Sequence, residues 1–558
     1  MFKGHPKGLI VASLANMGER FGFYTMYAIF TLFLQAKYGY DSTRSGIIWS
    51  SFLFSVYFLP LVGGIIADKW LGYGRTVTVG IFVMFLGYIL LALPFRGEAS
   101  LWLVICALFT IALGTGLFKG NLQALVGNLY DDPKYSAKRD SAFTIFYMCI
   151  NLGAMFAPTA AEAVNNYILR ASHFTYDSRI PVLAHKFLEN RLENVNEFLG
   201  IAQLQDASIT TETLKTFSGT YIDALSKSYH YAFGVACLSL IVSTIIFLGF
   251  KKFYRQADVT EKQKSANINT RDSVVEMSAD ETRRRVFALF MVFFVVIFFW
   301  MSFHQNGFTM TIFARDYTVP SVSKFTNLWF DLFALLSVFL SLGGLVLAIR
   351  KVSTTRVKLL GLAAFVVFGL LAYYRYSGFA EVNPFTPQMF QHFNPFFIVA
   401  LTPIILALFG WLRGKGKEPS SPKKIGIGMI LTALGFSLLI IASLGLSSPK
   451  ELGGEVSKIL VSPYWLISTY FILTIAELFL SPIGISFVSR VSPPKYKGLA
   501  QGGWLAATSV GNILVGVMGL FWSKVSLYVF WAILVVCCLI SATFIFSILK
   551  RLEKASGN

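Results

Sequence analysis

Residues 100–129, SLWLVICALFTIALGTGLFKGNLQALVGNL, form one long apolar run in which Lys119 is the only charged side chain. A helix rises about 1.5 Å per residue, so this run is long enough to cross a hydrocarbon core of about 30 Å. Comparable runs recur along the whole chain and predict an all-α polytopic membrane protein with about 14 transmembrane helices. The predicted spans are residues 8–36, 46–67, 76–95, 100–129, 141–165, 229–250, 286–312, 326–349, 359–377, 393–412, 425–446, 461–489, 499–522 and 526–549.

The composition supports a membrane protein and excludes several soluble classes. Of the 558 residues, 55% are hydrophobic and only 14% are charged, whereas soluble domains carry about 25% charged residues. A secreted disulfide scaffold, a nucleic-acid-binding factor and most soluble enzymes are therefore excluded. The five cysteines all lie within apolar runs, which indicates buried apolar side chains rather than disulfides or a metal site.

The distribution of basic residues predicts the orientation of the chain. When the N-terminus is placed in the cytoplasm, the cytoplasmic segments contain 31 Lys and Arg residues and the short outer loops contain nine. Membrane proteins retain their excess positive charge on the cytoplasmic side. This asymmetry accounts for the net charge of +19 without a nucleic-acid partner, and it places both termini in the cytoplasm.

Two polar segments divide the spans into groups. Residues 166–228 mix charged and apolar residues at helical spacing and predict a small extracytoplasmic helical cap. Residues 251–285 carry nine positive charges and predict a cytoplasmic linker on the inner leaflet, whose anionic lipids attract basic segments. Six helices, a linker and six further core helices predict paired bundles around a central path. The predicted units are 1–165 with 229–250 (N-terminal six-helix bundle), 166–228 (insertion), 251–285 (linker), 286–312 with 393–549 (C-terminal six-helix bundle), 326–377 (extra helix pair) and 550–558 (cytoplasmic tail).

Four charged residues stand out near the middle of predicted spans: Glu19, Arg20, Lys119 and Glu477. Each costs at least about 2.5–3.5 kcal/mol near the centre of a bilayer, so such residues are candidates for function. Their charges sum to zero, with both positive residues in the first half of the chain and Glu477 in the second. One interpretation is structural ion pairing between helices. The other, which we favour, is a shared polar cavity whose opposite charges suit a zwitterion.

Aromatic and amide side chains accompany these charges within the spans. An aromatic residue in a membrane helix usually packs, whereas an Asn or Gln must find a partner or face water. His304 is the only histidine well inside a span, and it is either a titrating group or a packing residue. The further candidates are Tyr24, Tyr57, Asn151, Trp300, Gln305, Asn394 and Trp504.

The run GTGLFKG at residues 114–120 looks like a nucleotide-binding loop, but it lies within a span and follows no strand. Its glycines instead favour close helix packing. No GxxxxGK[ST] motif occurs in the chain. Transport by this chain must therefore draw its energy from a gradient rather than from ATP, and we expect no cofactor, no metal and no catalytic residue.

Several motifs together resemble the proton-dependent oligopeptide transporter (POT/PTR) family of the major facilitator superfamily. The segment GGIIADKWLGYGR (63–75) is similar to the superfamily loop between helices 2 and 3. The runs GTGLFKGNLQALVGNLY (114–130), FYMCINLGAMFAP (146–158) and AELFLSPIGISFVSRVSP (476–493) resemble the family's helix 4, helix 5 and helix 10 signatures. The resemblance covers nearly all of the twelve core helices. It implies a major facilitator fold of two six-helix bundles, here with two extra transmembrane helices.

The family's helix 1 signature, ExxERF, is matched in part. Residues 16–21 read NMGERF and are followed by Tyr24, so Asn16 replaces the first glutamate. In the family this motif is tied to proton coupling. Many members also pair an acidic residue of helix 7 with an arginine of helix 1. Because His304 and Tyr27 stand at the corresponding places, we expect this gate pair to be absent.

The resemblance implies roles for the candidate substrate residues. Arg20 and Lys119 would hold the carboxylate of a peptide. Glu477, with Asn151 and Asn394, would hold its amino terminus. The other members of the expected substrate site are Tyr24, Tyr57, Trp300, Gln305, Ser481 and Trp504.

The resemblance also implies roles in coupling and in the cytoplasmic loop. Proton coupling would involve Glu19, Arg20, Lys119 and His304. Protonation of Glu19 would free Lys119 from an ion pair and let it take the peptide carboxylate. The loop residues Asp68, Gly72 and Arg75 would form a charge relay and a tight turn.

We therefore expect a secondary active transporter that imports di- and tripeptides by proton symport through alternating access. The alternatives are a peptide carrier without proton coupling, a carrier of another small zwitterion or anion such as nitrate, and a membrane-embedded enzyme or peptide sensor. The expected partners are small peptides, protons and membrane lipids, without nucleic acid, for a monomeric protein. The expected location is a cell membrane, in particular the inner membrane of a bacterium.

Overall fold

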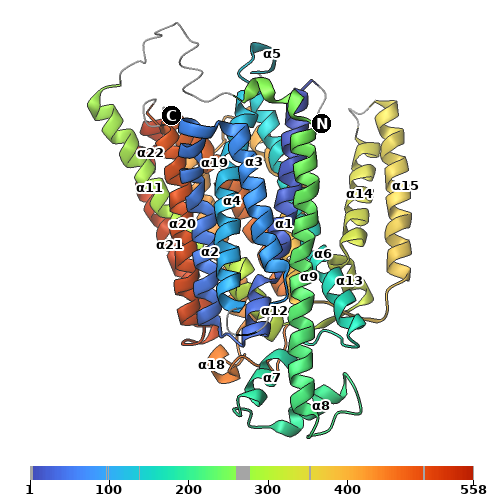
Figure 1. Cartoon of the computed structure of the whole chain (residues 1–558). Helices are drawn as coiled ribbons and strands as arrows, with labels where there is room; N and C mark the ends of the chain where they lie inside the picture. The colour runs from blue at the N-terminus through green and yellow to red at the C-terminus, as the bar shows by residue number, and fades with distance from the viewer. Residues whose placement is uncertain are drawn as a thin grey trace.

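The computed structural model of the chain is a bundle of long helices (Figure 1). It describes residues 4–95, 97, 100–136, 138–258, 277–350, 354–493 and 497–556. The first and last described residues lie at one end of the bundle, which we call the terminal end. The short helices α7 (Ile180–Leu188) and α8 (Val195–Gln203) lie at the opposite end, which we call the insertion end.

Thirteen helices in the described part of the chain are long and apolar enough to cross a membrane. They coincide with thirteen of the predicted spans. The remaining span is α1 (Lys7–Tyr38), a helix of 32 residues that is less apolar because it carries Asn16, Glu19 and Arg20. The protein is thus a multi-pass, all-α membrane protein, as predicted.

The first half of the bundle consists of six long helices: α1 (Lys7–Tyr38), α2 (Ser42–Ile66), α3 (Tyr73–Ala92), α4 (Ser100–Asn128), α6 (Arg139–Ala171) and α9 (Leu214–Gly249). Within this half, α1 packs against α6 and α9, and α4 packs against α2 and α3. α9 begins well before residue 229, the predicted start of this span. Its first turns extend beyond the bundle at the insertion end, where α7 and α8 pack against them (Figure 1).

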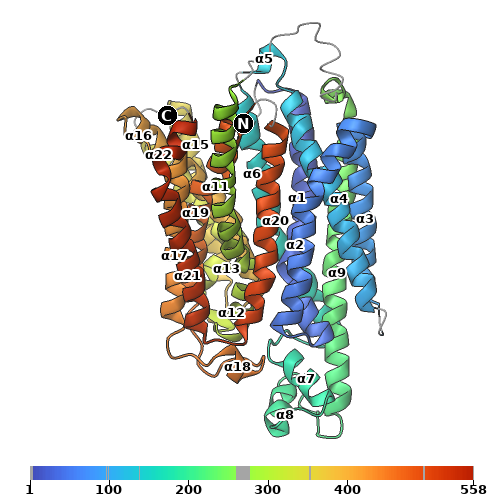
Figure 2. The same cartoon turned by 90° about the vertical axis from the view of Figure 1, so that its left-hand side faces the viewer.

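The second half contains α11 (Ala279–Phe303), η4 (His304–Gly307), α12 (Thr309–Asp316), η5 (Pro387–His392), α16 (Phe393–Gly414), α17 (Ser421–Ala442), α19 (Tyr464–Val491), α20 (Lys497–Trp522) and α21 (Leu527–Ser547). α17 packs against α19 and α21, and α11 packs against α20 and α21. The two halves meet where α20 packs against α2 (Figure 2). They also meet where α16 and η5 pack against α6.

A further helix pair stands beside the bundle. α14 (Leu332–Ile349) and α15 (Thr355–Ser377) pack against each other and lie outside the twelve-helix core (Figure 1). Aromatic contacts of α14 connect the pair to the core: Phe333 lies 6.3 Å from Phe156 of α6, and Phe339 lies 5.7 Å from Phe396 of α16, between ring centroids. A two-stranded antiparallel sheet, β1 (Ser321–Ser323) with β2 (Val382–Pro384), joins the segments that precede and follow the pair.

The remaining elements are short: η1 (Ala67–Leu71), α5 (Pro133–Ser136), η2 (Lys251–Phe253), η3 (Arg255–Ala257), α13 (Lys324–Phe330), α18 (Pro449–Leu452) and α22 (Leu549–Ser556). The predicted linker 251–285 begins with η2 and η3, and it ends in the first turns of α11. Its residues 259–276 lie outside the described residues.

Two predicted spans are interrupted, and a side-chain cap explains the second break. The span 286–312 is divided by η4, where the Thr309 hydroxyl donates to Gln305 Oε1 at 2.7 Å. The span 326–349 is divided at Asp331, whose carboxylate accepts the backbone N–H of Ala334 at 2.8 Å and so caps the start of α14. Such caps satisfy backbone donors that a helix leaves open at its N-terminus.

Glycines allow close contact between α2 and α4. A Cβ atom built on Gly63 of α2 would lie 2.7 Å from the carbonyl carbon of Gly116 and 3.1 Å from Cα of Leu117, both in α4. The neighbouring Gly64 faces open space. The glycines of the run 114–120 therefore serve helix packing, as predicted, because only small residues let two backbones approach this closely.

Replacing Gly63 by alanine is expected to destabilise the protein, because the added methyl group must push α4 away from α2. Overpacking of this kind costs about 1–3 kcal/mol. Gly64→Ala is the matched control, and a helical Gly→Ala change in open space stabilises by about 0.5–1 kcal/mol. Thermal unfolding of the two detergent-solubilised variants compares them directly. Equal unfolding temperatures would contradict a close α2–α4 contact.

Candidate functional site

The charged pair of helix α1 is buried and internally neutral. The Arg20 guanidinium donates to both carboxylate oxygens of Glu19, from Nε at 2.5 Å and from Nη2 at 2.6 Å. Glu19 is 1% and Arg20 4% exposed. The guanidinium also lies 4.8 Å from the centroid of the Phe23 ring. A bidentate pair of this kind places two opposite charges in one geometry and leaves no net charge.

Lys119 of α4 does not form the expected ion pair with Glu19. Its ammonium group lies 4.0 Å from the centroid of the Tyr57 ring on α2, which is a cation–π contact. Glu19 is instead occupied by the adjacent Arg20. Across the described residues, the Lys119 ammonium has no carboxylate within ion-pair distance. Its amine therefore lies in the first half against an aromatic ring rather than in an ion pair.

The Glu477 carboxylate of α19 lies in the second half and is held by neutral partners. Its carboxylate accepts the Asn394 amide of α16 at 2.8 Å and the Tyr147 hydroxyl of α6 at 3.4 Å. Asn394 also donates to the Thr474 hydroxyl at 3.1 Å. These partners are neutral, and Glu477 is only 8% exposed. In the part of the chain that is described, Glu477 has no basic partner.

Tyr147 was not among the residues predicted from the sequence. It lies one helical turn before Asn151, whose amide donates to the Tyr147 carbonyl at 3.0 Å. Residues four apart share one face of a helix. This spacing could have identified Tyr147 as soon as Asn151 was selected. Because Tyr147 belongs to the first half and Glu477 to the second, their hydrogen bond links the two halves.

His304 joins an aromatic and amide cluster at the helix break. Its ring stacks on Trp300 at a centroid distance of 4.8 Å and lies 5.8 Å from the Tyr57 ring. Its Nδ1 is hydrogen-bonded to Oδ1 of Asn512 on α20. Tyr57 thus stands between Lys119 and His304. Asn512, which the sequence analysis did not select, fixes the orientation of the imidazole.

Several other predicted residues are placed differently. Gln305 is fully buried and satisfied within its own turn, since its amide donates to the Met301 carbonyl at 3.1 Å. The Trp504 ring packs against Gly484 of α19, one turn after Ser481. Tyr24 contacts the Phe23 ring edge-on at 5.4 Å. Gln305 is therefore a structural residue here, whereas Tyr24 is adjacent to the Arg20 region.

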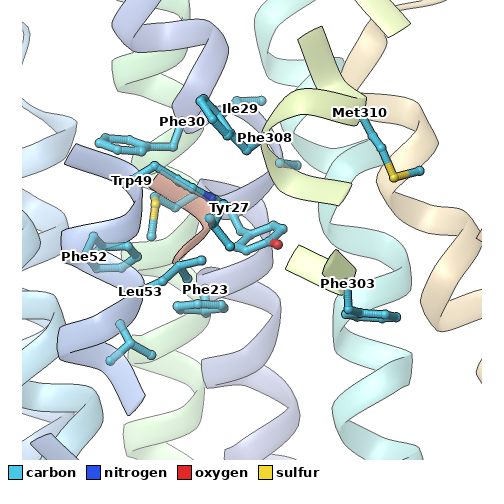
Figure 3. Packing of buried hydrophobic residues seen from close by; sticks show 14 of the residues in the cluster. Phe23, Tyr27, Ile29, Phe30, Trp49, Phe52, Leu53, Phe303, Phe308 and Met310 are labelled. Carbon is cyan, nitrogen blue, oxygen red and sulfur yellow. The ribbon is translucent and has the colours of Figure 1, made fainter. Parts of the chain in front are cut away.

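Tyr27, which stands at the predicted gate position of helix 1, makes a polar contact without charged groups. The Tyr27 hydroxyl donates to Asn306 Oδ1 at 2.7 Å, and the Tyr27 ring packs 4.6 Å from Trp49 (Figure 3). One turn further along α1, the Thr31 hydroxyl donates to the Gly307 carbonyl at 3.0 Å. His304 does not face Tyr27 in this contact, because it is held by Asn512.

The same face of α1 continues this contact toward the insertion end. Gln35 accepts a hydrogen bond from Arg315 of α12 at 2.6 Å, and Arg315 also binds Asp316 at 2.6 Å. Beyond it, Lys186 of α7 forms a 2.6 Å salt bridge with Glu455. We call the contacts from Tyr27 to Lys186 the outer seam. They join the two halves at the insertion end.

The predicted loop motif of Asp68, Gly72 and Arg75 forms a turn between α2 and α3, and its charge relay stays a prediction. Gly72 has φ +78°, a backbone conformation that favours glycine. The Asp68 carboxylate accepts the Tyr73 hydroxyl at 2.8 Å, while Arg75 is exposed. Asp258, which follows η3, accepts the backbone N–H of Gly74 at 2.7 Å and caps α3. The linker residue Asp258, rather than Arg75, holds this turn.

Among the described residues, no group of three or more His, Cys, Asp or Glu side chains is arranged to hold a metal ion. What the arrangement offers is a neutral Glu19–Arg20 pair and two single charges of opposite sign on facing halves. Aromatic rings from Tyr24, Tyr57, Trp300 and Trp504 accompany these groups. These groups are the ones from which a binding site for a small molecule with a positive and a negative end can be proposed.

Comparisons with known proteins agree with the motifs and with the fold. A family model described as the POT family matches residues 74–269 and 379–531. The peptide transporter YePEPT of Yersinia enterocolitica is 26% identical over 93% of this chain and 88% of its own length. The dipeptide and tripeptide permease B of Xenorhabdus bovienii is 27% identical over 91% of this chain and 86% of its own.

Solved structures share the architecture. A crystal structure of the peptide transporter POT in complex with sulfate aligns with a TM-score of 0.65 at 21% identity, covering 100% of this chain and 96% of that one. A POT family transporter in complex with 5-aminolevulinic acid aligns with a TM-score of 0.67 at 19% identity, covering 99% and 98%. Because the family model matches more than half of its residues, this chain belongs to the POT family.

Proposed function

We propose that this protein is a secondary active transporter that imports di- and tripeptides by proton symport. The observation that carries the proposal is the pair of uncompensated charges on facing halves, Lys119 and Glu477. A peptide with free ends carries the complementary charges. Membership of the POT family supports the proposal, as do the names of the relatives, which are peptide transporters and di- and tripeptide permeases.

The proposed binding mode assigns one end of the peptide to each half. Lys119, together with Arg20, takes the carboxylate, and Glu477 with Asn394 and Tyr147 takes the ammonium group. Asn151 supports Tyr147 through its hydrogen bond to the same turn. Aromatic residues around the charges accept different peptide side chains. A ligand that neutralises both groups reduces the cost of keeping two charges in the membrane interior.

Alternating access follows if the two six-helix groups rock about this site. The outer seam is formed in the present structure, so the peptide would be released at the terminal end, where the basic loops predict the cytoplasm. The proposed location of the protein is the inner membrane of a bacterium. Protonation of Glu19 together with arrival of the peptide carboxylate would transfer Arg20, rather than Lys119, from Glu19 to the peptide. Proton and peptide would then promote each other's binding.

A second candidate is a carrier for another small zwitterion. A related fold was solved with 5-aminolevulinic acid, which carries an ammonium group and a carboxylate. The same two charges would serve such a molecule. Competition between labelled dialanine and single zwitterions distinguishes the two, since a peptide carrier must prefer ligands that contain a peptide bond.

An inward proton gradient should drive accumulation of labelled dialanine into proteoliposomes that contain the protein. A proton that moves down 100 mV releases about 2.3 kcal/mol, which is sufficient for more than about tenfold accumulation. The measurement compares internal and external peptide with the gradient and after its collapse by an uncoupler. Equilibration without accumulation would support a carrier that is not coupled to protons, and no uptake of any peptide would refute peptide transport.

Lys119→Ala should reduce this uptake by about tenfold or more, because a hydrogen bond to a charged group contributes about 1.5–3 kcal/mol. The fold should survive, since the variant removes an uncompensated charge. Lys215→Ala, at an exposed position of the insertion, is the matched control. Unfolding temperatures of both variants separate loss of binding from loss of structure. Full uphill uptake by Lys119→Ala would contradict the assigned role.

Glu477→Gln should abolish the preference for a free amino terminus. The wild-type protein is expected to bind dialanine better than N-acetyl-dialanine, by about tenfold or more, because only the free ammonium group compensates the carboxylate. The glutamine variant keeps the shape and the hydrogen bond from Asn394 but removes the charge. Competition binding in detergent measures both ligands. An unchanged preference in the variant would place the ammonium group elsewhere.

A further inference from the structure

Glu162 of α6 is an acidic residue within a span that the proposed binding mode does not use. It is partly buried, and its carboxylate accepts the Thr386 hydroxyl at 2.8 Å. Thr386 directly precedes η5, which leads into α16 of the second half. The hydrogen bond therefore crosses between the two halves. Across the described residues, Glu162 has no ion-pair partner.

The surroundings of Glu162 contain buried polar atoms that lack protein partners. Thr159 and Asn165 lie three residues before and after Glu162, on the same face of α6. The Thr159 hydroxyl and both amide atoms of Asn165 have no hydrogen-bond partner among the described residues, and the same holds for both amide atoms of Gln388 in η5. Asn165 is 2% and Gln388 0% exposed. Buried polar groups of this kind recruit ordered water.

The outer seam contains two carboxylates, but each is paired with a basic side chain, Asp316 with Arg315 and Glu455 with Lys186. Tyr27, Thr31 and Gln35 bind neutral groups or an arginine. Arg315 is always charged and already paired with Asp316. Glu162 differs because it is a carboxylate whose partner across the seam is a neutral hydroxyl.

Other charged and titratable groups around this part of α6 belong to several elements. They are Tyr176 after α6, Tyr229 of α9, the Arg315–Asp316 pair of α12, His392 of η5, the Glu19–Arg20 pair of α1 and Glu477 of α19. The two arginines are occupied by their own carboxylates. None of these groups provides a free cation to keep Glu162 ionised when the seam is closed.

We propose that Glu162 is a second proton-binding carboxylate of the transport cycle. When α6 and η5 separate, its carboxylate takes a proton from water on the insertion side. The neutral acid is then enclosed against Thr386 as the outer seam closes. An ionised carboxylate without a cation is unfavourable in such a place, so closure of the seam requires the proton.

In the later stage of the transport cycle, the proton leaves through water that binds the polar side chains of the same interface. From Thr386 the second half continues through Gln388 to Asn394, which holds Glu477. Water held between these groups returns Glu162 to its ionised form and delivers the proton to the terminal side. This inference rests on the proposed proton symport, and it adds a coupling residue outside the helix 1 motif.

The test uses the full-length protein in proteoliposomes that contain the pH indicator pyranine. External labelled dialanine is added, and two quantities are measured: peptide-dependent proton uptake and gradient-free counterflow of dialanine. Glu162→Gln should keep counterflow within about twofold and lower the number of protons taken up per peptide by about half, because Glu19 still carries its own proton. Glu162→Asp should restore proton uptake. Glu212→Gln, an exposed carboxylate of the insertion, should behave as wild type.

The outcomes separate the two hypotheses. Wild-type protein without counterflow of any peptide would refute the proposed peptide transport, and counterflow without proton uptake would refute the symport. With both activities present in the wild type, normal proton uptake by Glu162→Gln would overturn the role of Glu162. Loss of counterflow in both the glutamine and the aspartate variants would also overturn it, because the residue would then be structural.

Discussion

A charge inside the hydrocarbon region must be compensated, and this constraint organises the whole site. Glu19 and Arg20 compensate each other within one turn of α1. Lys119 and Glu477 do not, because they lie on different halves and are held by an aromatic ring and by neutral donors. The protein therefore maintains two opposite charges at a distance. A zwitterionic ligand can neutralise both, and it can do so only when it contacts both halves at once.

This arrangement also relates binding to movement of the halves. Glu477 already reaches the first half through Tyr147, and His304 reaches α20 through Asn512 while its ring approaches Tyr57 of α2. Under the proposed function, these binding groups take part in contacts that change when the two halves move. The outer seam, in contrast, is built from hydrogen bonds of α1 at positions 27, 31 and 35 and from a salt bridge at its rim. Hydrogen bonds that exchange for water contribute only about 0.5–1.5 kcal/mol each, so a seam made mainly of them can open.

The fold was largely predictable because the membrane imposes it. A helix is the structure that satisfies its own backbone in lipid, and so hydropathy located the spans, including the polar α1. The break at His304–Gly307 was missed because hydropathy does not report a change of helix type within an apolar segment. The break at Asp331 was missed because a single capping carboxylate changes the hydropathy of its segment little. The start of α9 was missed for a related reason. Its first turns lie beyond the bundle, where a helix no longer needs to be apolar.

The site was predictable in its residue types but not in its pairings. The free-energy cost of a charge in the membrane interior identified Glu19, Arg20, Lys119 and Glu477. The predicted ion pair between Glu19 and Lys119, however, was wrong. Neighbours along a helix do not normally face each other, but the long arginine side chain folds back to grip the adjacent carboxylate. Tyr147, Asn512 and Thr386 escaped notice because their significance depends on contacts across more than 200 positions of sequence.

Asn16 makes the Glu19–Arg20 pair more important for the proposed coupling. Asn16 is buried and cannot ionise, and its amide nitrogen has no partner among the described residues. Glu19 is then the carboxylate of this helix that can exchange a proton. Breaking a buried ion pair by removing one partner costs about 3–5 kcal/mol, more than the roughly 2.3 kcal/mol that one proton gains across 100 mV. Under the proposed function, a proton alone therefore cannot release Arg20. A peptide carboxylate must replace Glu19 at the same time. This requirement would make the protein transport the proton and the peptide only together.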